Sequence, residues 1–400
     1  MTPRSPLSYL PLFAAIFAIT PLAIDMYLPA MPGMTDDFST GISQVQMSLS
    51  IFLAGYALGM LTFGPMADHF GRKFFLIAGL SGFILTSLAL AFAPSIEWFI
   101  ALRLLQAIFG GAATVVVPGT IRDLFGKDTA KGMAYVSMAM MIAPMLAPTI
   151  GSLILSFTDW PKIFIVLSVY GFVILMIAMA KFPFLPPKPK QDHRLLHSIV
   201  KSYRIVFSNR HCYPFLLTTM VTTFSFFTYI TSVSFVYISV YELSEQTFGI
   251  LFGSNVVALM CGNFINARLV SRIGTLKMLR IALINAVFAA ACLLYVVASG
   301  ASVVWLVTAL LFLMANLIMV STNSDALVLL SFPNNSGTAT AVIGSLKFGS
   351  GAFAGLALSL LHDGTALPFA LIVATSVAIT AVVQSLVKWR RIPVPGQTSA

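Results

Sequence analysis

The sequence has 400 residues, of which 58% are hydrophobic and 9% are charged, and its formal net charge is +10. Charged residues make up about a quarter of an ordinary soluble domain, so this composition excludes that class. Apolar stretches of helix length recur along the chain, which predicts a polytopic helical membrane protein and excludes a barrel of short alternating strands.

The first apolar run covers residues 7–31 and contains one carboxylate, Asp25. A charged side chain within hydrocarbon costs at least about 2.5 kcal/mol, so an acid in this position is a functional candidate. Pro21, Pro29 and Pro32 lie near it and loosen the helix backbone. The five histidines fall in predicted loops or at span ends, which leaves carboxylates to carry protons through the membrane. The alternative is that Asp25 pairs with another buried charge and only holds helices together.

Twelve spans are predicted, and the basic residues set their orientation. With the N-terminus in the cytoplasm, all 23 Lys and Arg residues except Lys162, Arg103 and Lys347 fall on the cytoplasmic side or in the linker. The positive charge therefore reflects membrane topology and does not indicate nucleic-acid binding. The predicted spans cover residues 7–31, 43–67, 74–94, 98–120, 132–156, 163–184, 213–239, 247–269, 277–299, 303–328, 337–361 and 366–388.

The loop between the second and third spans contains Gly64-Pro-Met-Ala-Asp68-His-Phe-Gly71-Arg72-Lys73. The first glycine lets the helix end approach its neighbour, the second makes a tight turn, and the two basic residues mark the cytoplasmic side. This run resembles the loop signature of the major facilitator superfamily. The resemblance implies an all-α fold of twelve transmembrane helices in two pseudo-repeated six-helix bundles.

The same resemblance implies that this loop latches the two halves together on the cytoplasmic face. Asp68 can accept hydrogen bonds from a helix N-terminus at residues 334–337, and Arg72 can pair with Asp123 at the inner end of the fourth span. The alternative is that Arg72 and Lys73 serve only as topology determinants.

The fourth span contains Arg103-Leu-Leu-Gln106-Ala107, which resembles the family's Arg-x-x-Gln-Gly motif with alanine in the last position. At 1.5 Å per residue, Arg103 and Asp25 lie at similar depths, about 8 and about 9 Å from the outer surface. A buried arginine needs a carboxylate or carbonyl partner, and Asp25 is the membrane-embedded acid at that level. We therefore expect Asp25 and Arg103 to form the proton-coupling pair, in which the proton affinity of Asp25 depends on whether Arg103 is engaged.

The fifth span contains Ala143-Pro-Met-Leu-Ala147-Pro148-Thr-Ile-Gly151-Ser152. It resembles the Gly-Pro-x-x-Gly-Gly motif of the antiporters, with Ala147 and Ser152 in place of glycines. Prolines and small residues at this spacing predict a kinked helix that its neighbours approach closely. We expect Ala147, Pro148 and Gly151 to serve antiport, and an ordinary packing face is the alternative.

Residues 185–212 form the one long connection between spans. It begins as a proline-rich linker and continues as a basic, amphipathic helix that suits the anionic inner membrane surface. It divides the chain into an N-terminal six-helix bundle over 1–184 and a C-terminal six-helix bundle over 213–400. The run 267–277, between the eighth and ninth spans, looks like a distant repeat of the loop at 64–73, and repeated halves with a substrate site between them are a transporter architecture.

The runs 25–32 and 234–238 resemble the bicyclomycin-resistance (Bcr/CflA) subfamily of drug:proton antiporters. The seventh span is rich in small polar and aromatic residues, and a pocket for amphipathic drugs needs apolar walls with a few hydrogen-bonding groups. Lipid-facing or packing roles are the alternative for the aromatic residues. The predicted substrate-binding residues are Tyr27, Tyr56, Phe227, Tyr229, Asn316 and Lys347.

Lys347 is not explained by the family signatures. It lies about 15 Å into the eleventh span, near the bilayer midplane, where its ammonium cannot easily reach either surface. We expect it to face the cavity, to bind a ligand carbonyl or acid and to disfavour cationic drugs. The alternative is a structural ion pair with Asp325, near the inner end of the tenth span.

Together these features predict a proton-coupled efflux transporter that exports small amphipathic compounds or antibiotics by alternating access. Uptake or metabolite exchange on the same fold is one alternative, and an intramembrane enzyme or a pore is another. An enzyme is disfavoured because the spans show no histidine, no paired acids and no metalloprotease or phosphate-binding motif. We expect a monomer in the bacterial inner membrane, with both termini cytoplasmic, that contacts lipid, protons and a small-molecule substrate and uses no metal, cofactor or nucleic acid.

Overall fold

The computed structural model describes residues 6–183, 204, 208–332 and 336–387, apart from the side chains of 65, 68, 69, 127, 130, 131, 134, 138–140, 336–338 and 341. Within these ranges the chain is built of helices, and they contain no strand. The prediction of an all-α protein is confirmed.

Twelve helical segments in the described ranges are long and apolar enough to cross a membrane. This number confirms the predicted twelve-span organisation, and the chain is a multi-pass membrane protein. The segments are Pro6–Asp37, Ile42–Gly64, Arg72–Leu90, Ile96–Phe125, Tyr135–Leu155, Pro161–Lys181, Arg210–Val240, Glu245–Ile273, Thr275–Ala298, Val303–Leu330, Val342–Leu361 and Leu367–Leu386.

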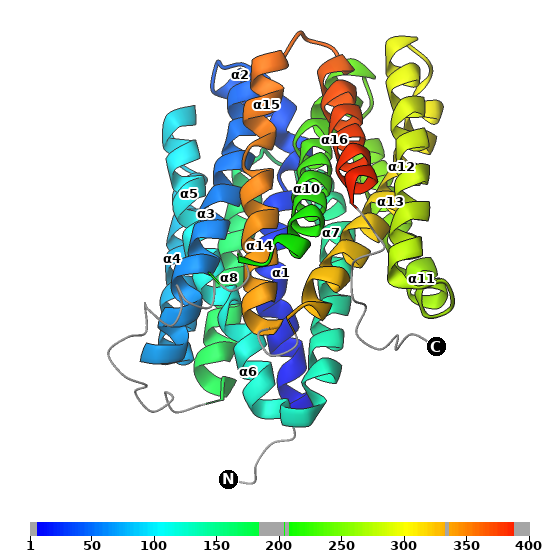
Figure 1. Cartoon of the computed structure of the whole chain (residues 1–400). Coiled ribbons are helices and arrows are strands. Elements are labelled where there is room, and N and C mark those ends of the chain that lie inside the picture. The colour runs from blue at the N-terminus through cyan, green and yellow to red at the C-terminus, as the bar shows by residue number, and fades with distance from the viewer. Residues whose placement is uncertain (1–5, 184–203, 205–207, 333–335, 388–400) are drawn as a thin grey trace, which may run out of the picture. The chain divides into compact units, whose positions relative to one another are not determined.

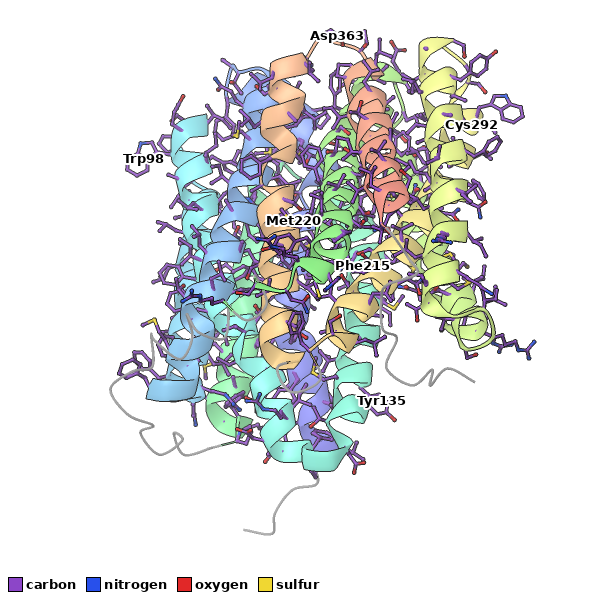
Figure 2. All side chains as sticks on the ribbon, in the orientation of Figure 1. Trp98, Tyr135, Phe215, Met220, Cys292 and Asp363 are labelled. Carbon is purple, nitrogen blue, oxygen red and sulfur yellow. The ribbon has the colours of Figure 1, made fainter. Side chains whose placement is uncertain are left out.

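Many large apolar side chains point outward from these helices, as lipid-facing side chains do (Figure 2). Trp98 is 61% exposed and Tyr135 is 48% exposed. A soluble monomer rarely carries so much contiguous apolar surface, so these side chains fit a hydrocarbon environment.

The described chain divides into two compact units. The first contains the residues up to 183 together with Ile230–Val256, and the second contains those of 204–229 and from Val257 onward. The two helices that hold Ile230 and Val256 therefore contribute to both units. The predicted linker helix within 185–212 lies almost wholly outside the described residues, and the predicted domain boundaries stay predictions.

The helices of the first unit pack in a few close pairs: α3 and α4 both lie against α5, and α1 lies against α7. Small residues allow these approaches. A Cβ added to Gly79 of α4, for example, would lie 2.6 Å from the backbone nitrogen of Ala113 in α5. Figure 1 labels the α-helices. In chain order the elements of this part are η1 (Pro6–Tyr9), α1 (Leu10–Asp25), η2 (Leu28–Ala30), α2 (Met31–Asp37), α3 (Ile42–Phe70), α4 (Arg72–Leu90), α5 (Ile96–Thr114), α6 (Val116–Phe125), η3 (Gly126–Asp128), α7 (Thr129–Leu155) and α8 (Pro161–Lys181).

The rest of the chain forms η4 (Arg210–Cys212), α10 (Tyr213–Ser234), η5 (Phe235–Val240), α11 (Glu245–Ile273), α12 (Thr275–Ala298), α13 (Val303–Leu330), α14 (Ser336–Gly351), α15 (Ala354–Leu361) and α16 (Leu367–Leu386). In the second unit an apolar cluster joins the start of α10, the end of α13 and the first turns of α14. The Ser324 hydroxyl donates to the Phe215 carbonyl over 2.8 Å and adds a polar tie between α10 and α13. The eleventh span is interrupted between α14 and α15, close to Lys347.

Candidate functional site

The first span changes its helical geometry directly after Asp25. The α-helix α1 ends there, and a turn and the tight 3-10 segment η2 lead into α2. Pro29 has no N–H and cannot donate to the carbonyl of Asp25 four residues earlier. The last carbonyls of α1 therefore lack their regular helical partners. Asp25 is 3% exposed, so this interruption is sealed from solvent.

Arg103 of α5 lies against this interruption and is fully buried. Its Nη1 donates to the carbonyl of Ala23 over 3.0 Å and to Oε1 of Gln106 over 2.6 Å. The guanidinium also lies 4.5 Å from the centre of the Tyr27 ring and 4.2 Å from that of Phe52. Arginine suits such a site because its planar group stacks on rings while its edge donates hydrogen bonds.

The predicted ion pair between Arg103 and Asp25 is wrong for this structure. No contact within ion-pair distance joins the two side chains, and the arginine is held by the backbone carbonyl of Ala23 instead. Asp25 Oδ1 and Arg103 Nε and Nη2 are buried without a hydrogen-bond partner among the described residues. The open last turn of α1 explains the difference, since it offers a carbonyl two residues before the carboxylate. The proton-coupling roles of both residues stay predictions.

The antiporter-like run of α7 lies against the same interruption. A Cβ on Gly151 would collide with the carbonyl oxygen of Met26, the residue after Asp25. Ser152, the next residue of α7, donates to the carbonyl of Glu245 at the start of α11 over 2.8 Å. Both contacts lie within the first unit. Gly151 therefore brings α7 next to Asp25, while the antiport role of Ala147, Pro148 and Gly151 stays a prediction.

The predicted contact between Arg72 and Asp123 is confirmed: Arg72 Nη1 lies 2.9 Å from Asp123 Oδ2. The pair joins α4 to α6 inside the first unit. Gly119 of α6 makes room for it, because a Cβ there would lie 2.7 Å from Cζ of Arg72. Gly119 was not among the predicted site residues, since only the position of the Arg72 side chain reveals its role.

The rest of the predicted latch loop is described in part. Gly71 has a φ of 106°, which favours glycine, and it separates α3 from α4. Lys73 donates to the carbonyl of Met179 over 3.3 Å, and a Cβ on Gly64 would lie 3.3 Å from Val115. The side chain of Asp68 and residues 334–335 lie outside the described part. The latch function stays a prediction.

The six predicted substrate-binding residues divide between the two units, so a shared pocket stays a prediction. Tyr27 and Tyr56 belong to the first unit, where their hydroxyls bond to Ser48 and Thr114 over 3.2 and 2.9 Å. The members in the second unit are Phe227, Tyr229, Asn316 and Lys347. Of these, Asn316 donates to the carbonyl of Phe312 in its own helix over 2.8 Å.

The predicted alternative for Lys347 is present: its ammonium forms an ion pair with Asp325 Oδ2. Thr219 of α10 donates to the other carboxylate oxygen over 2.8 Å, so one carboxylate joins three helices. The two charged side chains are 26% and 22% exposed. Thr219 was not among the predicted site residues, although it lies in the polar seventh span. The substrate role of Lys347 stays a prediction.

Comparison with known proteins agrees with this architecture. The family model of the Major Facilitator Superfamily matches residues 13–356. A bicyclomycin resistance protein homolog of Haemophilus influenzae is 31% identical over 366 residues, which cover 90% of this chain and 91% of the relative. A chloramphenicol resistance protein of Pseudomonas aeruginosa is 27% identical over 362 residues, 87% of this chain and 83% of the relative. The crystal structure of a D-xylose-proton symporter has the same fold, with a TM-score of 0.74 and a sequence identity of 15%. The match covers 98% of this chain and 100% of the symporter chain. The chain belongs to the major facilitator superfamily.

Proposed function

We propose that this protein is a drug:proton antiporter that exports small amphipathic compounds by alternating access. The observation that carries the proposal is the sealed carboxylate of Asp25 at the interruption of the first span, with Arg103 bound to the adjacent backbone. A membrane-embedded acid that faces protein is a natural carrier of protons. The names of the relatives, which refer to bicyclomycin, chloramphenicol and multidrug resistance, support export of such compounds.

Arg103 supplies the means of coupling in this proposal. Two of its guanidinium nitrogens have no hydrogen-bond partner in the described part of the chain, and a third is anchored by the Ala23 carbonyl two residues from Asp25. When Asp25 loses its proton, its carboxylate attracts the guanidinium, and Arg103 exchanges the carbonyl for the carboxylate. This exchange pulls on the interruption of the first span, against which Gly151 of α7 packs. Proton release is thereby tied to a movement of helices.

We further propose that the transporter is a monomer in the bacterial inner membrane, with both termini in the cytoplasm. The distribution of basic residues supports this orientation. It needs no cofactor, because the proton gradient supplies the energy.

The test is transport by the purified protein in sealed vesicles. An imposed pH gradient should drive labelled chloramphenicol or bicyclomycin against its concentration gradient, with protons moving in the opposite direction, and an uncoupler should abolish the movement. The same compounds should be less toxic to an efflux-deficient host that expresses the protein. Drug and protons moving in the same direction would indicate uptake and contradict the proposal.

A further inference from the structure

The second unit contains an ionic cluster that the Asp25 site does not use. It consists of Lys347 of α14, Asp325 of α13 and Thr219 of α10, joined through the two oxygens of one carboxylate. All three residues lie within predicted spans, where a charged pair is costly to maintain. A cluster held at such cost is a candidate for a binding role.

The cluster differs from the Asp25 site in its accessibility. Asp25 is 3% exposed and Arg103 is fully buried, whereas the side chains of Lys347 and Asp325 are about a quarter exposed. Lys347 has three N–H donors, and Asp325 is the described partner of its ammonium. N–H groups of the ammonium therefore remain for a ligand.

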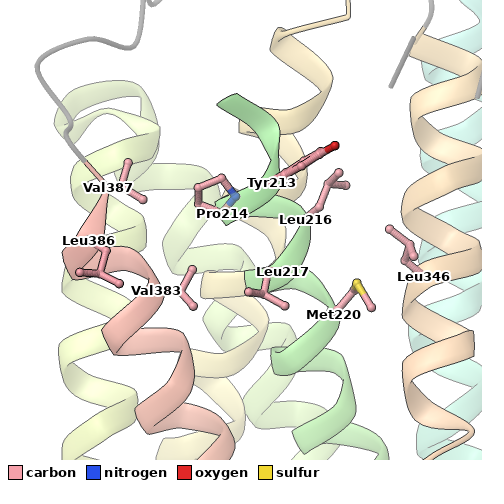
Figure 3. A pocket seen from close by; sticks show the side chains of 9 residues that line it. All are labelled: Tyr213, Pro214, Leu216, Leu217, Met220, Leu346, Val383, Leu386 and Val387. Atoms are coloured by element: carbon pink, nitrogen blue, oxygen red, sulfur yellow. The ribbon is translucent and has the colours of Figure 1, made fainter. Parts of the chain in front are cut away.

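Aromatic and apolar side chains lie on the same two helices, α10 and α14, as Thr219 and Lys347. Phe348 follows Lys347 in the chain, and its ring centre lies 5.8 Å from that of Phe227 in α10. Leu346, the residue before Lys347 in the chain, lines a cavity of ≈ 520 Å³ between α10, α14 and α16 together with Met220 (Figure 3).

The charges in the cluster determine what kind of ligand it can accept. The carboxylate of Asp325 already neutralises Lys347, so an acidic ligand would meet a second negative charge beside the ammonium. A cationic ligand would meet the ammonium itself. A neutral carbonyl or amide oxygen can accept the free N–H groups without either repulsion.

We propose that Lys347, Asp325 and Thr219, with Phe227 and Phe348 as the apolar wall, bind neutral aromatic compounds through a carbonyl or amide oxygen. Lys347 donates to that oxygen, Asp325 excludes acids, and Thr219 holds the carboxylate in position. This inference rests on the proposed transport function, because it names the substrate class. Of the two ligand groups expected for Lys347, a carbonyl and an acid, it keeps the carbonyl.

The test measures binding of three probes with the same naphthalene body to the purified protein by equilibrium dialysis. 2-Naphthamide is neutral, 2-naphthoate is an anion and 2-naphthylmethylammonium is a cation. The wild-type protein should bind the amide most tightly. Asp325→Asn keeps an oxygen for Thr219 but frees the charge of Lys347, so it should tighten binding of naphthoate relative to the amide by about tenfold. Lys347→Gln should weaken binding of the amide by about tenfold.

Lys277→Gln is the matched control, since it removes the same charge from an exposed position at the start of α12 and should leave all three affinities unchanged. An unchanged naphthoate-to-amide ratio in Asp325→Asn, or unchanged amide binding in Lys347→Gln, would overturn the inference. If either single variant fails to accumulate, the double variant removes both charges together, and it should bind the amide about tenfold more weakly than the wild-type protein does. Wild-type affinity for the amide in the double variant would also contradict the inference.

Chloramphenicol–proton exchange, measured on the same preparations, separates this inference from the proposed function. Coupled exchange by the wild-type protein without the expected change in probe preference refutes the subsite alone. The expected change without coupled exchange refutes the antiporter and leaves the subsite standing.

Discussion

Arg103 and Asp25 are neighbours in depth, yet the arginine bonds to a backbone carbonyl and to Gln106. Gln106 in turn donates to Ser87 over 2.8 Å, so the guanidinium belongs to a buried chain of hydrogen bonds that links α1, α5 and α4. Each buried polar group in such a chain is costly to leave unsatisfied. This chain holds Arg103 next to Asp25, and in the proposed cycle Arg103 gives up the Ala23 carbonyl when Asp25 loses its proton.

Asp25→Asn should abolish exchange of drug for protons and leave the fold intact. Asparagine has nearly the same size but cannot carry a proton, so exchange should fall to the level of protein-free vesicles. Asp36→Asn, on the exposed side of α2 in the same span, is the control and should exchange at the wild-type rate. Wild-type exchange by Asp25→Asn would show that another group couples proton movement.

Arg103→Lys should be impaired although it keeps the positive charge. A lysine ammonium does not stack between the Tyr27 and Phe52 rings as a planar guanidinium does. We expect the free energy of unfolding to fall by about 1–3 kcal/mol, because the ammonium does not reproduce the geometry in which the guanidinium donates to Gln106 and to the Ala23 carbonyl. Thermal unfolding in detergent and vesicle exchange measure the two effects. Full activity of this variant would mean that the charge alone is required.

At the scale of a helix, α7 is the element that touches the interruption of the first span on one face and the start of α11 on another. Pro144 and Pro148 lie inside it, and prolines bend a helix by removing backbone hydrogen bonds. Small residues next to these prolines allow backbone-to-backbone contact. α7 can therefore transmit a shift at Asp25 to its other neighbours.

Gly151→Ala tests this contact directly. The new methyl group would collide with the carbonyl of Met26, so α7 must move away from the first span. Overpacking of this kind costs about 1–3 kcal/mol, and we expect a lower melting temperature together with slower exchange. Gly253→Ala is the control, because the nearest atom to its Cβ would be the Met145 oxygen at 3.8 Å. Equal behaviour of the two variants would show that the contact is dispensable.

At the scale of the whole molecule, hydropathy alone predicts the twelve spans, because each must bury its backbone polar groups within one apolar helix. Ion pairs are predictable only in part, since Arg72–Asp123 was expected and Lys347–Asp325 was the alternative to a lysine that faces the cavity. The partner of Arg103 is not predictable, because every residue carries a carbonyl and only the local geometry of α1 exposes that of Ala23. The grouping of Ile230–Val256 with the first unit was equally hidden, since it depends on contacts such as that of Ser234 with Met31.

Two arginines, Arg72 and Arg122, lie near the carboxylate of Asp123, and they allow the proposed latch to be tested. Arg72 is buried and lies 2.9 Å from Asp123, whereas Arg122 is exposed and its Nε lies 3.7 Å from the same side chain. Exposed pairs contribute little, and removing one partner of a buried pair leaves a costly charge. If the loop is a latch, Arg72→Ala should reduce turnover about tenfold and change how a cysteine probe is labelled at the two membrane faces. The Kd for chloramphenicol in detergent should change less than about twofold.

Arg122→Ala is the control and should leave turnover and labelling near wild type. Equal effects of the two substitutions would indicate that Arg72 only helps to set the membrane topology. A loss of drug affinity that matches the loss of turnover would indicate that Arg72 acts in drug binding.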